Sequence, residues 1–479
     1  MPSLGNLGML VLLAGPFLAN LDFFITNVAL PTIQRDLHAS SAALELIVAG
    51  YGTAYAVMLV TGGRLGDDLG RRFMFTVGIA AFTVTSLAAG LAPSVPILLV
   101  ARVLQGASAA LMTPQTLATF HSSLEGRARH RAIGLYAVAG GLSGIVGQLL
   151  GGVLVDADVA GSGWRLIFLV NVPVGVVALL VLRRTVPQTR AAHAAGVDVP
   201  GTVLLGLAIA ALLVPLTEGS TLGWPWWSWV TLAAVPLLAA AFVAVSRRTE
   251  RAGRAPLLPP SILTVGSMRR GLPVLVGFFA VFGVFMFVFA IGVQDGLRKD
   301  ALSAGLAITP VGVAYFATSF AVPALLRRLD RNVLTLGLAI EAAGLATLLA
   351  LAATSWPMMS LRIAIAALVL VGVGQAMGVG SLFRLILSEV PAYAAGVGSG
   401  VLVTAQQTAM SIGVAGLGSL FTSLAARGSM PHAVVAILAV QAGLTLALVP
   451  ASRLLPAIAR ADGSDAATGG RAASSARVG

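Results

Sequence analysis

The sequence contains no cysteine and few charged residues. None of its 479 residues is Cys, and Asp, Glu, Lys and Arg together make up 10% of the chain. The missing cysteine excludes a disulfide framework and thiolate chemistry. The charged fraction lies well below the roughly 25% that is usual in soluble globular proteins, and 57% of the residues are hydrophobic. This composition predicts a polytopic membrane protein.

The chain also lacks the residue clusters on which enzymes and ATP-driven pumps depend. No Gly-x-x-x-x-Gly-Lys phosphate loop is present, which argues against direct ATP drive. Every His lies in a loop or at the end of an apolar run, so no metal site or nucleophile is assembled. We therefore expect no enzyme activity, no metal and no cofactor. The His residues are His38, His121, His130, His193 and His432.

The net charge of +12 raises the question of nucleic-acid binding. Such binding needs basic residues gathered on one soluble face, whereas here they are spread over short loops between apolar runs. We expect no nucleic-acid partner. The expected partners are membrane lipids, and the protein is expected to be a monomer.

Fourteen apolar runs are long enough, or nearly so, to cross a bilayer, which takes about 20 residues. They predict an all-α polytopic membrane protein with 14 transmembrane helices. The predicted spans are 7–30, 42–61, 73–92, 96–119, 132–155, 164–183, 200–218, 226–245, 271–293, 301–325, 332–353, 358–382, 396–421 and 432–452.

The orientation follows from the loops. An even number of spans places both termini on one side, and cytoplasmic loops carry an excess of Arg and Lys. The alternate loops on the side of the termini, with the C-terminal tail, hold 23 of the 30 Lys and Arg residues. We therefore expect a multi-pass protein of the cytoplasmic (inner) membrane with both termini cytoplasmic. The first run lacks a basic leader, so we read it as a membrane helix and not as a cleaved signal.

The chain is organised as six helices, two helices and six helices. We expect an N-terminal six-helix bundle in residues 1–190, two additional helices in 191–255, a C-terminal six-helix bundle in 256–455 and a disordered cytoplasmic tail in 456–479. The loop GGRLGDDLGRR between the second and third helices has a degenerate counterpart, VPALLRRLDRN, in the second set. Two repeated six-helix halves with a binding site between them are a known transporter architecture.

Asp22 and Arg102 are charges inside predicted membrane helices. A charge at the bilayer centre costs roughly 2.5 to 3.5 kcal/mol on insertion scales, and such residues usually handle ions or substrates. Asp22 lies about 13 Å, and Arg102 about 9 Å, below the same outer surface at 1.5 Å per residue. The two can pair, and proton binding to Asp22 would then be coupled to movement of Arg102. The alternative is a static ion pair that fixes helix packing.

Two further acids lie in predicted helices. Glu341 is about nine residues into its helix, near the midplane, where it can take up a proton, bind a cationic substrate or pair with a neighbouring helix. Glu45 is three or four residues into its helix, near the outer surface, where solvent can reach it. We rank it below the other two acids.

Several segments resemble a known family. GGRLGDDLGRR (Gly62 to Arg72) is similar to the loop signature of the major facilitator superfamily. LDFFITNVALP, RVLQGASAA and WRLIFLVNVPVG resemble its fourteen-helix drug:proton antiporter branch. The resemblance implies a proton-coupled secondary exporter of lipophilic small molecules, such as drugs or antibiotics, that works by alternating access. In such an exporter the charges inside the helices, Asp22, Arg102 and Glu341, are the candidates for proton coupling.

The loop from Gly62 to Arg72 is expected to act as a conformational latch. Gly63 and Gly70 permit tight turns or close helix approach, and Asp67 and Arg71 can pair with each other or with a helix end across the interface of the halves. The family has a basic residue where this chain has Asp68. A solvated turn remains the alternative.

Polar side chains in the helices are candidates to line a substrate cavity. Gln148 stands where the antiporter branch usually has a proline, and an interhelical hydrogen bond is its other reading. Of the neighbours Gln406 and Gln407 only one is expected to face inward. Export or flipping of a lipid or another amphiphile, and a non-transporting receptor, remain alternative functions. The cavity candidates are Asn27, Gln148, Gln406, Gln407 and Glu45.

Overall fold

A computed structural model describes residues 4–190, 196, 198–219, 222–254, 256–356, 361–391 and 395–456. Within these residues the chain is helical throughout and contains no strand. Fourteen described helices are long and apolar enough to cross a membrane, which confirms the predicted number. The chain is a multi-pass membrane protein. The tail predicted for 456–479 lies, from residue 457 on, outside the described residues.

The first six spans form the N-terminal bundle. The sixth is built from short pieces, because a 3-10 turn at Gly163–Arg165 runs into α6 and α7. Close packing inside this bundle depends on small residues, since a Cβ added at Gly106 of α4 would lie 2.2 Å from the carbonyl oxygen of Tyr51 on α2. The helices are α1 (Asn6–Leu37), α2 (Ser41–Leu69), α3 (Arg71–Gly90), α4 (Val95–Ser123), α5 (Gly126–Ala157), α6 (Leu166–Leu169) and α7 (Asn171–Thr185).

Two helices follow between the bundles, α8 (Val199–Glu218) and α9 (Trp226–Arg251). α8 packs against α2 and against the C-terminal bundle, with Ile209 and Leu213 in an apolar cluster with Ala415. α9 packs mainly on α8 and is largely exposed. The pair therefore lies at the periphery, with α8 covering the line where the bundles meet.

The last six spans form the C-terminal bundle, in which two spans contain a π-helical turn. Such turns often mark functional positions. The elements are α10 (Pro260–Leu263), α11 (Gly266–Ile291), η3 (Gly292–Gly296), α12 (Ala301–Leu329), α13 (Asn332–Ser355), α14 (Leu361–Leu387), α15 (Ala395–Gly413), η5 (Val414–Gly418), α16 (Ser419–Arg427) and α17 (Met430–Ser452).

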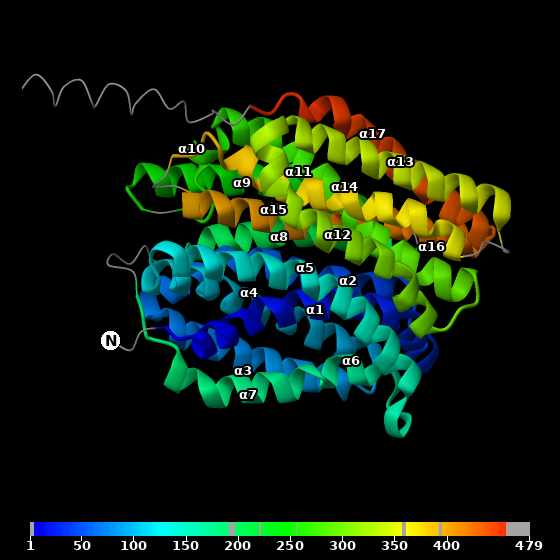
Figure 1. Ribbon diagram of the computed structural model, residues 1–479, viewed down its shortest axis with the longest axis horizontal. Helices are drawn as coiled ribbons and strands as arrows, with labels where there is room; N and C mark the ends of the chain where they lie inside the picture. Colours follow the sequence, from blue (N-terminus) through cyan, green and yellow to red (C-terminus); the bar gives the residue numbers. More distant parts are fainter. Residues whose placement is uncertain are drawn as a thin grey trace, which may run out of the picture.

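The two bundles lie side by side, with their helices running in the same general direction (Figure 1). The N-terminal bundle, in blue and cyan, is below the C-terminal bundle in this view. α1 begins and α17 ends at one end of the molecule, on the left of Figure 1, which we call the terminal end. The opposite end, where α16 lies, is called the far end.

The bundles meet along a surface that we call the seam, where α5 packs on α12 and α2 packs on α15, η5 and α16. Glycines permit this contact in the part nearer the far end. A Cβ at Gly152 would lie 2.7 Å from the carbonyl oxygen of Ala301, and one at Gly52 would lie 2.6 Å from Oγ of Ser411. The helices are therefore tightly closed on each other there.

The terminal half of α5 is packed differently. A Cβ at Gly134 or Gly140 would meet no described atom within 4 Å. On a helix with 3.6 residues per turn, Gly134 lies on the same face as Gly152, and Gly140 on nearly the same face as Gly147, which presses on α1. The face of α5 toward α12 and the face toward α1 are thus closely packed near the far end, whereas at Gly134 and Gly140, near the terminal end, there is room for a side chain.

Candidate functional site

Asp22 of α1 and Arg102 of α4 form an ion pair inside the N-terminal bundle. Nη1 of Arg102 donates to Oδ2 of Asp22, and both side chains have an exposed fraction of 0%. The sequence-based prediction that these two charges can pair is confirmed. Removing either partner would leave a buried charge without a counter-ion.

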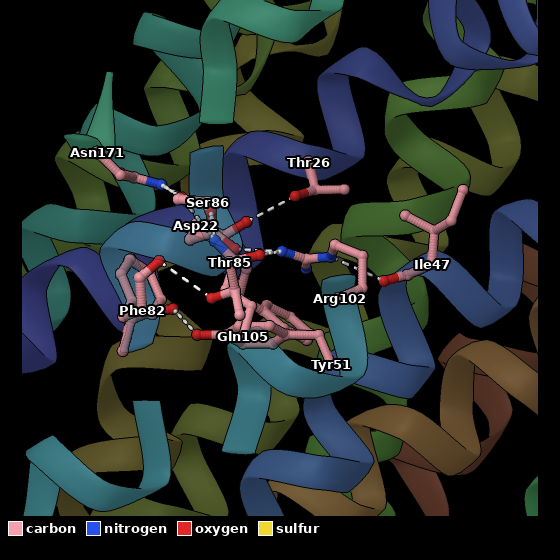
Figure 2. Close-up of polar contacts among 12 residues, drawn as sticks. Asp22, Thr26, Ile47, Tyr51, Phe82, Thr85, Ser86, Arg102, Gln105 and Asn171 are labelled. Atoms are coloured by element: carbon pink, nitrogen blue, oxygen red, sulfur yellow. Dashed lines mark hydrogen bonds and ion pairs between the residues drawn. The ribbon is translucent and has the colours of Figure 1, made fainter. Parts of the chain in front are cut away.

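Three other polar side chains surround the Asp22 carboxylate (Figure 2). Nε2 of Gln105 lies 2.9 Å, and Nδ2 of Asn171 lies 2.8 Å, from Oδ1 of Asp22, and both donate to it. The same two amides donate to Oγ of Ser86 on α3, at 2.8 and 2.9 Å. Four helices thus contribute to the cluster, and hydrogen bonds to the charged form stabilise an ionised Asp22.

The guanidinium of Arg102 is held from the other side by α2. Its Nε donates to the carbonyl oxygen of Ile47 over 3.1 Å, and its Cζ lies 4.3 Å from the ring centroid of Tyr51. The hydroxyl of Tyr51 donates to the carbonyl oxygen of Ala19 over 2.8 Å, which fixes the ring between α1 and α2. Nη2 of Arg102 has no hydrogen-bond partner among the described residues. The guanidinium therefore depends on Asp22 for much of its stabilisation.

Protonation of Asp22 would change what holds Arg102 in place. A proton on Asp22 would cancel its charge and leave the buried Arg102 with neutral acceptors alone, among them Gln105 and the carbonyl oxygen of Ile47. Truncating one partner of a buried pair costs about 3 to 5 kcal/mol, and neutralising it has the same physical effect. Arg102 can avoid this cost by moving toward water or another acceptor, which would displace α4 relative to α1.

Gln105, Asn171, Ser86 and Tyr51 were not singled out from the sequence. Gln105 lies three residues after Arg102, so the helix period alone places the two side chains together. Asn171 and Ser86 carry no such signal, because their place next to Asp22 depends on how α3 and α7 pack.

Glu341 lies inside the C-terminal bundle. It is 1% exposed, and its helix α13 packs on α14 and α17. The amide of Gln375 on α14 approaches the carboxyl group, but neither carboxyl oxygen has a well-formed hydrogen bond to any described residue. Unlike Asp22, this acid has no counter-ion within the described part of the chain. Burial without a cation strongly favours the neutral, protonated acid.

The predicted cavity residues divide between helix interiors and the seam. Asn27 is buried and donates to the carbonyl oxygen of Phe23 of its own helix over 3.1 Å. Gln148 of α5 is buried, with its Nε2 3.9 Å from Sδ of Met286 on α11 across the seam. Gln407 is buried and Gln406 is half-buried. The interhelical contact foreseen for Gln148 is therefore present.

The expectation that solvent reaches Glu45 is wrong. Its exposed fraction is 0%, because Thr422 of α16 covers it and donates to Oε1 over 2.9 Å. Glu45 therefore lies in the seam.

Comparison with protein families decides the identity of this fold. A model of the Major Facilitator Superfamily matches residues 12–200 and 199–414. The chain belongs to the Major Facilitator Superfamily.

Its relatives are transporters. The chain is 35% identical to a probable actinorhodin transporter of Streptomyces coelicolor, over 86% of this chain and 72% of that protein. It is 34% identical to a tetracenomycin C resistance and export protein of Streptomyces glaucescens, over 87% of this chain and 76% of that protein. Among solved structures, the inward-open xylose transporter of E. coli has the same fold at 14% identity, with a TM-score of 0.65 over 95% of this chain and 97% of the other.

The loop between α2 and α3 of this major facilitator protein is held within the N-terminal bundle. Asp67 and Arg71 pair with each other, with Nη2 of Arg71 2.8 Å from Oδ1 of Asp67. Nη1 of Arg71 also donates to the carbonyl oxygen of Ala118 on α4 over 3.0 Å. Of the two predicted alternatives, pairing with each other or with a helix end across the interface of the halves, the pairing of Asp67 with Arg71 is the one present.

The glycines of the loop differ in role. α2 continues through Gly63, where an added Cβ would make only ordinary contact with Pro114, so no tight turn forms there. The turn is at Gly70, whose φ of 109° suits glycine. A Cβ at Gly70 would lie 2.0 Å from Nε2 of Gln188, so the segment after α7 closes on the turn. The solvated-turn reading of Arg72 is too simple, because its Nη1 donates to the carbonyl oxygen of Val186 over 3.1 Å.

Proposed function

We propose that this protein exports hydrophobic or amphipathic small molecules, drugs or antibiotics among them, in exchange for protons and by alternating access. The observation that carries the proposal is the ion pair of Asp22 and Arg102, buried at 0% exposure in a membrane bundle. The names of the relatives support the substrate class, since they concern export of and resistance to antibiotics. We further propose that the terminal end faces the cytoplasm, on the basis of the basic residues gathered in its loops.

In this proposal Asp22 is the proton carrier and Arg102 the sensor of its charge. While Asp22 is ionised, Arg102 is held by it between α1 and α2. A proton taken up by Asp22 releases Arg102, and the cost of an unpaired buried guanidinium drives α4 to a new position. When Arg102 returns to Asp22, the proton is released on the other side of the membrane. Gln105 and Asn171 stabilise the ionised carboxylate in the state described here.

Glu341 is proposed as a second proton site. It has no cationic side chain beside it among the described residues, so it can bind a proton without displacing an Arg or Lys. Since α13 lies against α14 and α17, its protonation would act on packing inside the C-terminal bundle. Gln148 and Gln407, both buried near the seam, are proposed to contact substrate when the bundles separate.

The experiment is gradient-driven transport in proteoliposomes with a panel of cationic, neutral and anionic amphiphiles. Asp22→Asn should fold but lose transport driven by the pH gradient, because the amide cannot carry a proton. The matched control is Asp300→Asn, an exposed acid that begins α12 and whose carboxylate accepts from the backbone N of Ser303 over 2.6 Å. Asn is an equally good first residue of a helix, so this variant should transport normally.

The outcomes separate coupling from folding. Full gradient-driven transport by Asp22→Asn would disprove the coupling role. Loss of transport in both variants would point to general damage and would equally remove the support for Asp22.

A further inference from the structure

Glu45 of α2 is a buried acid that the proposed export cycle does not use. Its side chain lies in the seam, where it faces α16 of the other bundle. Thr422 donates to Oε1 over 2.9 Å, while Oε2 has no hydrogen-bond partner among the described residues. On the same face of contact Ser411 donates to the carbonyl oxygen of Ala49 over 3.3 Å. Glu45 is therefore a titratable group enclosed between two bodies that must separate in alternating access.

No charge compensates this carboxyl group. Within the described ranges, no Lys, Arg or His forms an ion pair with Glu45. The charged group that acts on it is Glu218 at the end of α8, which has the same sign. Arg102 contacts α2 at the carbonyl oxygen of Ile47 and the ring of Tyr51, and it is paired with Asp22. An ionised Glu45 in the closed seam would thus be a buried charge approached only by the hydroxyl groups of Thr422 and Ser419, with no counter-ion among the described residues.

A protonated Glu45 fits the same position well. The hydroxyl oxygen of Thr422 lies 2.9 Å from Oε1 of Glu45 and 3.1 Å from the carbonyl oxygen of Ser419. A hydroxyl has one hydrogen to donate and lone pairs to accept with. A neutral Glu45 can therefore donate its proton to Thr422 while Thr422 donates to Ser419. The ionised acid cannot form this chain.

We propose that Glu45 is a proton-binding site of the seam, and that α2 closes on α15 and α16 only after Glu45 has taken up a proton from the solution at the far end. In the open state water solvates the carboxylate. A hydronium ion gives its proton to a carboxyl oxygen, water leaves, and the neutral acid is enclosed against Thr422. Opening reverses the step. This inference rests on the proposed alternating access but not on which residue couples transport to the proton gradient.

The test measures closure of the far end directly and does not depend on transport. The chain has no native Cys, so spin labels can be placed at Leu91→Cys on the N-terminal bundle and Ala426→Cys on the C-terminal bundle, both exposed near the far end. Pulsed electron-resonance distances are recorded in nanodiscs over a range of pH. The ratio of closed to open protein should fall about tenfold for each pH unit above the midpoint, as expected for one proton.

Variants assign the proton to its residue. Glu45→Gln keeps the shape and an N–H donor but cannot ionise, so the far end should stay closed at every pH. Asp300→Asn is the matched control, because it neutralises an exposed acid that the proposed cycle does not use, and it should keep the pH dependence of the parent. Thr422→Val removes the hydroxyl but leaves the acid, so the pH dependence should persist with a shifted midpoint.

Two results would overturn the inference. One is a labelled parent whose distances do not change with pH. The other is an unchanged pH dependence in Glu45→Gln. The fate of the proposed function is read separately, since Asp22→Asn should lose gradient-driven transport and still show the pH-dependent closure. If that variant transports normally while Glu45→Gln is locked closed, the coupling proposal fails and the seam site stands.

Discussion

Asp22 and Arg102 neutralise each other at a depth where neither charge is stable alone. Gln105, Asn171 and the carbonyl oxygen of Ile47 hold the pair, so the contact links α1, α2, α4 and α7. A buried pair is weak support for stability as a whole, but loss of one partner is costly because the other charge remains. Stability measurements can therefore distinguish the pair from its separate charges.

The first residue-scale prediction is a double-mutant cycle. Arg102→Met should destabilise the protein by about 3 to 5 kcal/mol, because it leaves the Asp22 carboxylate buried without its cation. Asp22→Asn together with Arg102→Met should recover most of this loss, since no unpaired charge remains. Thermal unfolding in detergent measures both. Additive losses in the double variant would mean that the two charges are not energetically coupled.

Whether a residue of the site can be predicted from the sequence depends on whether its contacts follow from helix geometry or from the packing of distant helices. Asp22 and Arg102 could be matched from depth alone, because helix rise converts sequence position into distance from the surface. Asn171 could not, since it reaches Asp22 only through the packing of α7. The burial of Glu45 could not be foreseen either, because the residue that covers it, Thr422, lies 377 positions further along the chain.

At the scale of the element, α5 has two environments on the same faces. A Cβ added at Gly152 would lie 2.7 Å from the backbone of α12. A Cβ added at Gly134, which lies a whole number of turns earlier on the same face, would meet no described atom within 4 Å. The half of α5 nearer the far end is therefore packed tightly against its neighbours. Its small residues are needed only in that half.

Alanine substitutions test this difference. Replacing Gly by Ala inside a helix gains roughly 1 kcal/mol in intrinsic propensity at either site, so the comparison isolates packing. Gly152→Ala should shift the labelled far-end distances toward the open state and lower transport, because its Cβ would lie 2.7 Å from the Ala301 carbonyl oxygen. Gly134→Ala should leave both unchanged. Equal behaviour of the two variants would contradict the tight closure of α5 on α12.

Helix number could be predicted from run length, but helix ends could not. The first predicted span stops at residue 30, whereas α1 continues to Leu37 through Gln34, Arg35 and Asp36. α2 likewise continues to Leu69, through most of the glycine-rich segment for which the sequence predicts a loop. Apolar run length reports where a helix leaves the hydrocarbon, and the backbone can continue its hydrogen bonding beyond that point into the polar region.

At the scale of the molecule, the two inserted helices are tied more firmly to one bundle than to the other. Thr61 of α2 and Thr202 of α8 share a hydrogen bond of 2.8 Å. Contact of α8 with η5 of the C-terminal bundle is apolar, through Ile209, Leu213 and Ala415. Apolar surfaces can slide past each other more readily than hydrogen-bonded ones, so α8 is expected to move with the N-terminal bundle.

Disulfides can test this coupling, because every cysteine in the variant would be an introduced one. Thr61→Cys with Thr202→Cys should form a disulfide, since the hydroxyl oxygens that the sulfur atoms replace lie 2.8 Å apart, and transport should survive because the joined helices move together. A short bifunctional reagent between Ile209→Cys and Ala415→Cys should instead stop transport, as it ties α8 to the bundle past which it slides. Reduction should restore the first variant to its starting state with no change in rate. Transport blocked by the first link and tolerated with the second would show that α8 travels with the C-terminal bundle, and the inserted pair would then be an extension of that half.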